Sequence, residues 1–307
     1  MKLIENLMNL PETRKTYLEI LEIHDKEVPI ANLLAFFFRN KEIHGLNNIF
    51  IKALLKTKFY ELDVKKYPKS KGTLISLVKF EKKQQIILNS ITNVEVETEV
   101  KTSKDNDENK RIDIVINTEN FVICIEFKIN HKLNNPLEVY KNHIENKYKN
   151  TDKQIFYIVL TPSKKEADVS NVQNYLEKNK DFKQVILSNF IKNIQSELPL
   201  DFKGNSSFNY YNDFIQTIQN REIRYKRSLL LERLSNSFNN QRIKSEYIIN
   251  NKGGYIQIKK INHFLKIRIE NKKFQVEKWN QKKEKIILDQ FDLNTDLDDI
   301  VINTSNY

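Results

Sequence analysis

The chain has 307 residues, a formal net charge of +11 and 39 % hydrophobic residues, enough for one or two globular domains and too ordered a composition for a disordered chain. The single cysteine, Cys124, excludes an intramolecular disulfide and a cysteine-based zinc cluster, and it favours a reducing compartment. No apolar run near the N-terminus reaches the roughly 20 residues that cross a bilayer. We therefore expect a soluble, cytoplasmic protein without a membrane partner, and the positive charge suggests a polyanionic ligand.

The first third of the chain is predicted to be mainly helical. Leucine and phenylalanine recur at spacings of three and four over residues 1–58, and a further helix is expected over residues 74–88. An alternating run over residues 94–100 is typical of a strand, and the polar residues 101–110 are typical of a loop.

Strands and helices then alternate along the chain. Two β-rich runs, residues 111–117 and 121–129, are separated by three residues and fit a hairpin. The elements expected after them are a helix with Leu137, Tyr140, Ile144 and Tyr148 on one face, strands over 155–160 and 185–188, and helices over 169–176 and from 191 onward. This order predicts an α/β fold with a mixed sheet flanked by helices.

The composition changes after about residue 220. A basic helix is expected over residues 224–238, followed by strand-like runs over 254–260, 264–271, 274–279 and 285–288. Residues 221–285 carry a net charge of +12, whereas residues 286–307 carry −5. We therefore expect two domains, residues 1–220 and a small basic accessory domain of helix and antiparallel sheet, residues 221–307.

The predicted hairpin brings together residues that can do chemistry. Because strand side chains alternate between faces, Glu126 and Lys128 share a face with Cys124, and Asp113 points away from the isoleucines beside it. Folding the hairpin places Asp113 beside Glu126. Two carboxylates provide the hard oxygen ligands that suit Mg²⁺ or Mn²⁺, and Lys128 would orient or deprotonate a water and stabilise charge on phosphorus. Taken alone, Glu-x-Lys would favour a surface salt bridge instead.

Two sequence blocks resemble a known family. Residues 111–116, a short turn and residues 122–129 (Arg-Ile-Asp-Ile-Val-Ile and Val-Ile-Cys-Ile-Glu-Phe-Lys-Ile) resemble the metal-binding hairpin of the PD-(D/E)XK nuclease superfamily. Upstream, Glu-Val-Pro-Ile-Ala-Asn-Leu-Leu-Ala-Phe-Phe-Phe at 27–38 and Glu-Ile-His-Gly-Leu at 42–46 are similar to a bacterial branch with an acidic helix and a His-Gly turn. The resemblance covers roughly residues 16–188 and implies a restriction-endonuclease-like fold.

The resemblance also implies site residues beyond the hairpin. Glu27 would be aimed into the active site by its helix and would assist metal binding, although a residue favoured by the helix macrodipole is an equal alternative. Glu99 is a further acidic candidate, but Glu95 and Glu97 share its phase, and a solvated strand face is slightly favoured for all three.

Several positions depart from the family pattern or carry weaker signals. Ile112 stands where the superfamily's name has proline, and Leu133 and Pro136 stand where many relatives carry glutamines. For His44 a structural turn cap is favoured over substrate contact, and for His131 a solvated loop position is favoured. The histidines lack metal-ligand spacing, so a zinc site is not expected.

The C-terminal strands alternate apolar with polar residues. Their polar face carries three bases that would contact phosphate backbone, Lys259, Lys266 and Arg268, and a solvated charged face is an equal alternative. Three aromatic residues could stack on bases, Tyr255, Phe264 and Trp279, although core packing is expected for at least two of them.

The function expected from these features is that of a Mg²⁺-dependent or Mn²⁺-dependent nuclease, an endonuclease or an enzyme that cuts from ends. Its substrate would be DNA rather than RNA, and family habit suggests a restriction or anti-phage defence role. Two alternatives stay open: a non-catalytic nucleic-acid-binding module, and a nuclease subunit active only with a partner protein. A homodimer is equally open, because no dimer signature is present in the sequence.

Overall fold

The computed structural model divides the chain into two compact units, Lys15–Thr217 and a second unit made of Met1–Arg14 with Ile218–Tyr307. The residues that it describes are 14–61, 70–79, 81–102, 110–129, 133, 135–162, 179–240, 245–248, 254–259, 263–270, 273–280, 285–292, 300 and 304. The sequence-based division into residues 1–220 and 221–307 is kept as a proposal.

The larger unit contains a seven-stranded sheet in the order β2-β1-β7-β6-β5-β4-β3. The strands are β1 (Lys58–Glu61), β2 (Ser70–Thr73), β3 (Glu95–Lys101), β4 (Arg111–Asn117), β5 (Phe121–Phe127), β6 (Gln154–Thr161) and β7 (Phe182–Ile186). Strands β3, β4 and β5 pair antiparallel, whereas β5, β6 and β7 pair in parallel. The sheet is therefore mixed, and β5 lies where the two pairing modes meet.

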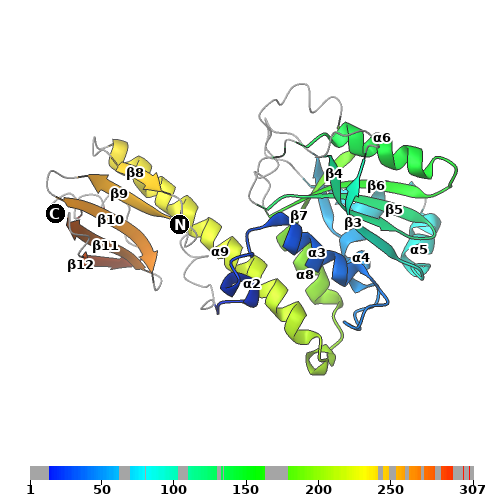
Figure 1. The fold of residues 1–307 in the computed structure, drawn as a ribbon, viewed down its shortest axis with the longest axis horizontal. Helices are drawn as coiled ribbons and strands as arrows, with labels where there is room; N and C mark the ends of the chain where they lie inside the picture. Colours follow the sequence, from blue (N-terminus) through cyan, green and yellow to red (C-terminus); the bar gives the residue numbers. More distant parts are fainter. Residues whose placement is uncertain are drawn as a thin grey trace. The chain divides into compact units, whose positions relative to one another are not determined.

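Helices cover both faces of this sheet, with α6 on one side and α3, α4 and α8 on the other (Figure 1). The helical elements of this unit are α2 (Tyr17–Ile20), α3 (Glu27–Phe38), α4 (Ile49–Leu55), η1 (Leu74–Leu77), α5 (Glu81–Asn89), α6 (Leu137–Tyr148), α8 (Leu187–Glu197) and η3 (Phe202–Gly204). The long helix α9 (Phe208–Asn240) contributes its first residues to this unit and the rest to the second. The architecture is the predicted α/β fold.

Strand β5 is buried along its whole length, because helices cover both of its faces. The isoleucines of β5 fill one of its faces, and the face that carries Glu126 is buried as well. Val122 and Cys124, on the other face, pack in one cluster with Tyr140 and Ile144 of α6, and Ile112 joins them. The carboxylates of the hairpin therefore lie at the border of a second hydrophobic core.

Other elements differ from the sequence-based boundaries. Strands β1 and β2 were not expected within or beside the helical N-terminal region. Residues 187 and 188 belong to α8 and not to a strand, because the chain turns into the helix directly after Ile186. The helix expected over 74–88 is split into η1 and α5. The helix expected over 169–176 and most of the loop over 101–110 lie outside the described residues.

The second unit contains a five-stranded antiparallel sheet in the order β12-β11-β10-β9-β8. Its strands are β8 (Ser245–Ile248), β9 (Tyr255–Lys259), β10 (His263–Glu270), β11 (Lys273–Asn280) and β12 (Lys285–Asp292). Strand β8 was not expected, and the basic helix expected over 224–238 lies within the longer α9.

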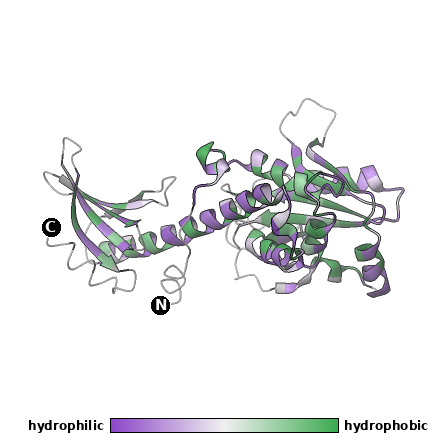
Figure 2. Ribbon diagram, turned by 90° about the horizontal axis from the view of Figure 1, so that it is seen from below, coloured by the Kyte–Doolittle hydropathy of each residue, from purple (hydrophilic) through white to green (hydrophobic). Residues whose placement is uncertain are grey.

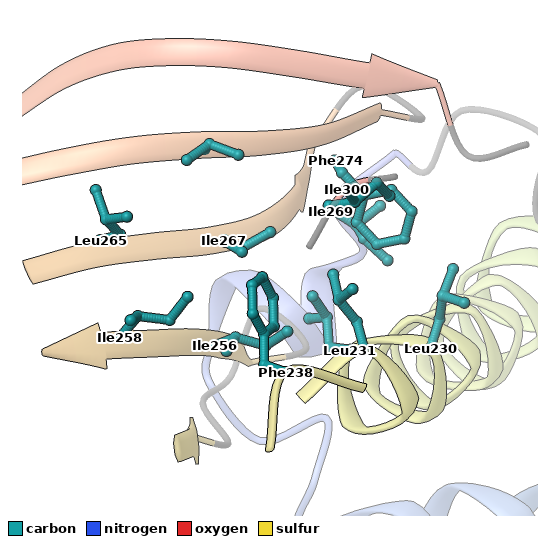
Figure 3. Close-up of a cluster of buried hydrophobic side chains, with 12 residues drawn as sticks. Leu230, Leu231, Phe238, Ile256, Ile258, Leu265, Ile267, Ile269, Phe274 and Ile300 are labelled. Atoms are coloured by element: carbon teal, nitrogen blue, oxygen red, sulfur yellow. The ribbon is translucent and has the colours of Figure 1, made fainter. Parts of the chain in front are cut away.

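The core of the second unit lies between α9 and one face of this sheet. Helix α9 alternates hydrophilic and hydrophobic residues along its length (Figure 2), as an amphipathic helix does. Leu231 and Phe238 of α9 pack in one buried cluster with Ile256 and Ile267 of the sheet (Figure 3). The opposite face of the sheet, which we call the outer face, carries the polar residues.

Among the described residues, none of the helices combines the length and the apolar character that a membrane crossing needs.

Candidate active site

The register of the β4–β5 hairpin brings the two predicted metal ligands together. Ile114 pairs with Ile125 and Val115 with Cys124, so one further step places Asp113 opposite Glu126. Opposite residues of an antiparallel pair point to the same face. Asp113 Oδ2 also accepts a hydrogen bond of 2.6 Å from the Phe127 N–H, which fixes the carboxylate at the end of β5.

Lys128 follows β5 and joins this group. Its backbone N–H donates to the Leu160 carbonyl at 3.0 Å, so the chain continues beside β6 past the last residue of β5. Its Nζ lies 2.8 Å from Glu126 Oε1 and 3.0 Å from Glu27 Oε2. The side chain is almost fully buried, and one ammonium therefore bridges two carboxylates.

Glu27 reaches the site from the first turn of α3, 101 residues earlier in the chain. Its Oε1 accepts a 3.1 Å hydrogen bond from the Ile129 N–H, and its Oε2 faces Lys128. The start of α3 and the end of the hairpin thus meet, which is the first of the two alternatives that the sequence left open for Glu27. Its contacts with Lys128 and Ile129 hold the side chain at the end of the hairpin, and its metal role stays a prediction.

The two hairpin carboxyls are hard to ionise where they lie. Burial, the main cause, raises the pKa of Asp113 to about 7; Glu27 and Glu99 add to the shift, while the Phe127 N–H and Lys128 oppose it. Burial also raises the pKa of Glu126 well above its ordinary value, and the Asp113 charge adds to this effect. A second cation at this position would relieve both penalties.

Glu126 is fully buried, yet its oxygens are poorly satisfied. Oε1 has the Lys128 ammonium as its partner at 2.8 Å, whereas Oε2 has no hydrogen-bond partner among the described residues. An unsatisfied buried carboxylate is costly, so this donor fits a divalent ion that prefers oxygen ligands. In the part of the chain that is described, no group of three or more His, Cys, Asp or Glu side chains is arranged around one point as a metal cage.

The sequence analysis missed Tyr140 as a site residue. It was expected only as an apolar helix position, but its buried hydroxyl accepts a 3.3 Å hydrogen bond from Asn135 Nδ2. Burial first, and the negative charges of Glu126 and Asp113 after it, raise the pKa of Tyr140. The hydroxyl therefore lies close enough to the two carboxylates for their negative charges to disfavour its ionisation. A polar tip on an otherwise apolar helix face was the available signal.

Two buried polar side chains further along the sheet were also missed. Gln184 Nε2 donates to Thr161 Oγ1 at 2.9 Å, and both residues are almost fully buried. The register Glu126–Val159–Gln184 across β5, β6 and β7 places Gln184 on the same face as Glu126. Polar residues in otherwise apolar strands were the signal here.

The acidic residues of β3 fall into two groups. Glu95 accepts from Asn117 Nδ2 at 2.9 Å, and Glu97 pairs with Lys147 at 2.8 Å. Glu99 has a left-handed backbone (φ 54°) and lies near enough to Asp113 to raise its pKa. Glu99 is therefore the β3 carboxylate whose charge acts on the site.

His44 is fully buried, and both ring nitrogens have backbone partners. Nε2 lies 2.9 Å from the Arg39 carbonyl, and Nδ1 accepts from the Leu46 N–H at 2.9 Å. These contacts fit the structural cap favoured by the sequence analysis. His131 lies outside the described residues. Cys124 is a buried free thiol whose pKa burial raises.

On the C-terminal sheet, Lys266 and Arg268 point to the outer face. Tyr255 and Trp279 do as well, since Lys266 Nζ lies 4.6 Å and 4.3 Å from their ring centres. Core packing of at least two of the three aromatic residues was therefore a wrong expectation: their strand phase is opposite to that of the core residues. The side chains of Lys259 and Phe264 lie outside the described part.

The mixed sheet with helices on both faces is an α/β architecture of the restriction-endonuclease-like kind. A model of the PD-(D/E)XK nuclease superfamily matches residues 16–287. The chain belongs to this superfamily, and the resemblance seen in the sequence is confirmed. Searches among curated proteins and among solved structures gave no match. Membership indicates a nuclease acting on nucleic acid, and such nucleases generally use divalent metals.

Proposed function

We propose that the chain is a metal-dependent endonuclease that hydrolyses phosphodiester bonds in DNA, with Asp113 and Glu126 as metal ligands. The observation that carries the proposal is the fully buried Glu126, whose Oε2 has no partner among the described residues although Asp113 and Lys128 lie beside it. Buried carboxylates of this kind are retained where they bind a cation.

A bound Mg²⁺ or Mn²⁺ would supply Lewis-acid polarisation of the scissile phosphate and a water of lowered pKa. The residues Asp113 and Glu126 would hold this ion. Burial disfavours the charged form of Lys128, but Glu126 and Glu27 outweigh this and raise its pKa. Lys128 is therefore better suited to stabilising charge on the phosphate than to removing a proton from water.

Two neighbouring side chains would support this chemistry. Glu27 holds the Lys128 ammonium at 3.0 Å and so orients it. Tyr140 places a hydroxyl, fixed by Asn135, near the carboxylates. Glu27 acts here as a positioning residue, with assistance to the metal as its second proposed role.

A restriction or anti-phage defence role is part of the proposal and rests on family habit. Dependence on a partner protein and dimerisation are open within it. The cleavage assay below separates a self-sufficient enzyme from a binding module that does not cleave.

The test uses plasmid DNA and a structured RNA with Mg²⁺, Mn²⁺ or EDTA. Wild type should cleave DNA with either metal, while Asp113→Asn and Glu126→Gln should not. Glu97→Gln, which removes an exposed carboxylate of the same sheet, serves as the matched control. DNA binding without cleavage under every metal condition contradicts the proposal.

A second readout does not depend on turnover. Mn²⁺ should raise the melting temperature of wild type and of Glu97→Gln, because a ligand that binds only the folded state stabilises it. Asp113→Asn should lose this shift. A metal-induced shift of equal size in Asp113→Asn would remove this carboxylate from the proposed metal site.

A further inference from the structure

The outer face of the C-terminal sheet carries a connected cluster of charged and aromatic side chains, which we call the platform. Its members come from β9, β10, β11 and β12: Tyr255, Lys266, Arg268, Gln275, Glu277, Trp279 and Lys285. The apolar side chains of the same strands pack on the other face against α9. The platform is thus separate from the core of its unit.

Glu277 organises the platform from its centre. It is only 1 % exposed, and its Oε1 accepts from Arg268 Nε at 2.8 Å and from Gln275 Nε2 at 2.6 Å. Its Oε2 accepts from Trp279 Nε1 at 2.9 Å, and Lys285 Nζ lies 3.0 Å from Oε1. One carboxylate therefore fixes the orientation of a guanidinium and of an indole ring.

The surroundings of Glu277 stabilise its ionised form. Burial opposes ionisation, but the hydrogen bonds from Arg268, Lys285 and Trp279 outweigh burial and lower the pKa below its ordinary value. Arg268 also contacts Glu270 at 3.3 Å through Nε. A guanidinium has five donors. Among the described residues these contacts use Nε and Nη2, and Nη1 is the group that we assign to a phosphate.

Two aromatic rings flank one cation on this face. Lys266 Nζ lies 4.3 Å from the Trp279 ring and 4.6 Å from the Tyr255 ring. Both rings are half-buried and belong to the polar face, not to the core cluster. Aromatic rings on a charged sheet face are the arrangement on which unpaired bases stack.

The charge of the surrounding segment favours a polyanion as the occupant. Residues 221–285 carry a net charge of +12, and three platform residues, Lys266, Arg268 and Lys285, are basic. Cations contact phosphates while aromatic rings contact bases. A double helix offers phosphates but keeps its bases stacked inside, so it would leave the rings unused.

We propose that the platform binds single-stranded nucleic acid, with Trp279 and Tyr255 stacking on bases and Lys266, Arg268 and Lys285 contacting the phosphates. Glu277 is the positioning residue that holds Arg268 and Trp279 in place. The inference deepens the proposed function by giving this nuclease a single-strand binding surface, yet the binding itself needs neither metal nor cleavage.

The chain contains one tryptophan, so its fluorescence reports on the platform directly. In EDTA, oligothymidylate and oligouridylate should quench the emission of the full chain because a base stacks on Trp279. Comparing the two distinguishes DNA from RNA as the preferred single strand. Inorganic polyphosphate, which has charge but no bases, should leave the emission unchanged.

Two results would contradict base stacking on the platform. Quenching by polyphosphate to the same extent, or tighter binding of a duplex of the same length, would show an electrostatic surface without stacking. Because all binding is measured in EDTA, a failure here is distinct from a failure of cleavage.

Substitutions at Trp279 test whether this ring contributes to the binding free energy. By fluorescence anisotropy with a labelled oligothymidylate, Trp279→Ala should weaken binding by about five- to a hundredfold, and Trp279→Tyr, which keeps a stacking ring, should weaken it less. If Trp279→Ala binds as wild type does, the proposal is wrong. Trp279→Tyr keeps the test valid should Trp279→Ala fold poorly by circular dichroism.

A matched pair of lysines tests the phosphate contacts. Lys266→Ala should reduce the slope of log affinity against log salt by about 0.7. Lys226→Ala removes the same charge from α9, where Lys226 pairs with Glu222 at 3.1 Å, and should change the slope less. Equal effects of the two substitutions would contradict a specific role for Lys266.

Discussion

Two buried glutamates, one in each unit of the molecule, have opposite surroundings. Glu126 is 0 % exposed and Glu277 is 1 % exposed, so burial does not separate them. Glu277 accepts hydrogen bonds from Arg268, Gln275 and Trp279, and its pKa is lowered. Glu126 has one ion pair and an unsatisfied Oε2, and its pKa is raised.

On the proposed function, the difference separates a carboxylate with a structural role from one that binds metal. A carboxylate whose charge the protein already satisfies holds its neighbours in place, because moving it would leave buried donors unpaired. A buried carboxylate without hydrogen-bond partners raises the free energy of the folded protein, and a bound cation can remove this penalty. Whether a buried carboxylate has hydrogen-bond partners in the protein, more than its burial, therefore indicates whether it is a candidate metal ligand.

The largest expected effect is on cleavage. Glu126→Gln should reduce DNA cleavage with Mg²⁺ by more than about a thousandfold, because it removes a proposed metal ligand. Glu277→Gln should leave cleavage of a short duplex within about tenfold. Single-turnover rates at saturating protein measure both. Equal losses in the two variants would break the distinction between the glutamates.

The next effect is on stability and has the opposite order. Glu277→Gln should lower the free energy of unfolding of its unit by about 3 kcal/mol, because Arg268 and Lys285 would lose a buried partner. Glu126→Gln should change the stability of the metal-free protein by less than about 1 kcal/mol, since Lys128 keeps Glu27 as partner. Urea unfolding in EDTA, followed at the single tryptophan and by far-UV circular dichroism, compares them. A Glu126→Gln variant as unstable as Glu277→Gln contradicts this prediction.

A further effect on stability concerns pH. The pKa of Asp113 is raised from 3.8 to about 7 in the folded protein, so the folded state binds more protons than the unfolded state between these values. The stability of the metal-free protein should therefore fall as pH rises from about 4 to 7, by up to about 1.4 kcal/mol per pH unit. Above pH 7 this contribution should level off.

Asp113→Asn tests this dependence, because it removes the Asp113 titration together with the charge that helps to raise the pKa of Glu126. The difference in unfolding free energy between the variant and wild type should grow from pH 4 to 7 in EDTA. A constant difference over that range would mean that Asp113 titrates normally.

The smallest effect is expected at Tyr140. Tyr140→Phe keeps the ring in the core but removes the hydroxyl that Asn135 contacts, so cleavage should fall by about tenfold with little loss of stability. Tyr148→Phe, on the same buried face of α6, is the control. Steady-state cleavage rates and melting temperatures separate a role in the site from a packing role.

The hairpin could be predicted from the sequence because strand alternation fixes faces within a few residues. Asp113 and Glu126 follow from a local pattern and a short turn. The placement of Glu27 at the hairpin could be expected only through the family resemblance, since 101 residues separate it from Lys128 and no local periodicity connects them. Its ion pair with Lys128 was not expected. Short strands such as β1 also escape prediction, because four residues carry too little pattern.

The role of Glu277 was hidden for a related reason. Alternation places this residue on the outer face of the sheet. An acidic residue on such a face is expected to be exposed to solvent, and the sequence singled out only the basic residues of that face. Its donors come from three different strands, so only the register reveals them. Tertiary pairing, not composition, decides whether such a charge is exposed or enclosed.

The backbone contact between Lys128 and Leu160 has a consequence for protein synthesis. A nascent chain that has not yet exposed β6 from the ribosome lacks the carbonyl that holds the Lys128 N–H. Such a fragment therefore lacks one of the backbone contacts that hold Lys128 in place, although Glu27, Asp113 and Glu126 have all been translated. The position of Lys128 in the finished protein thus depends on a strand that is translated after it.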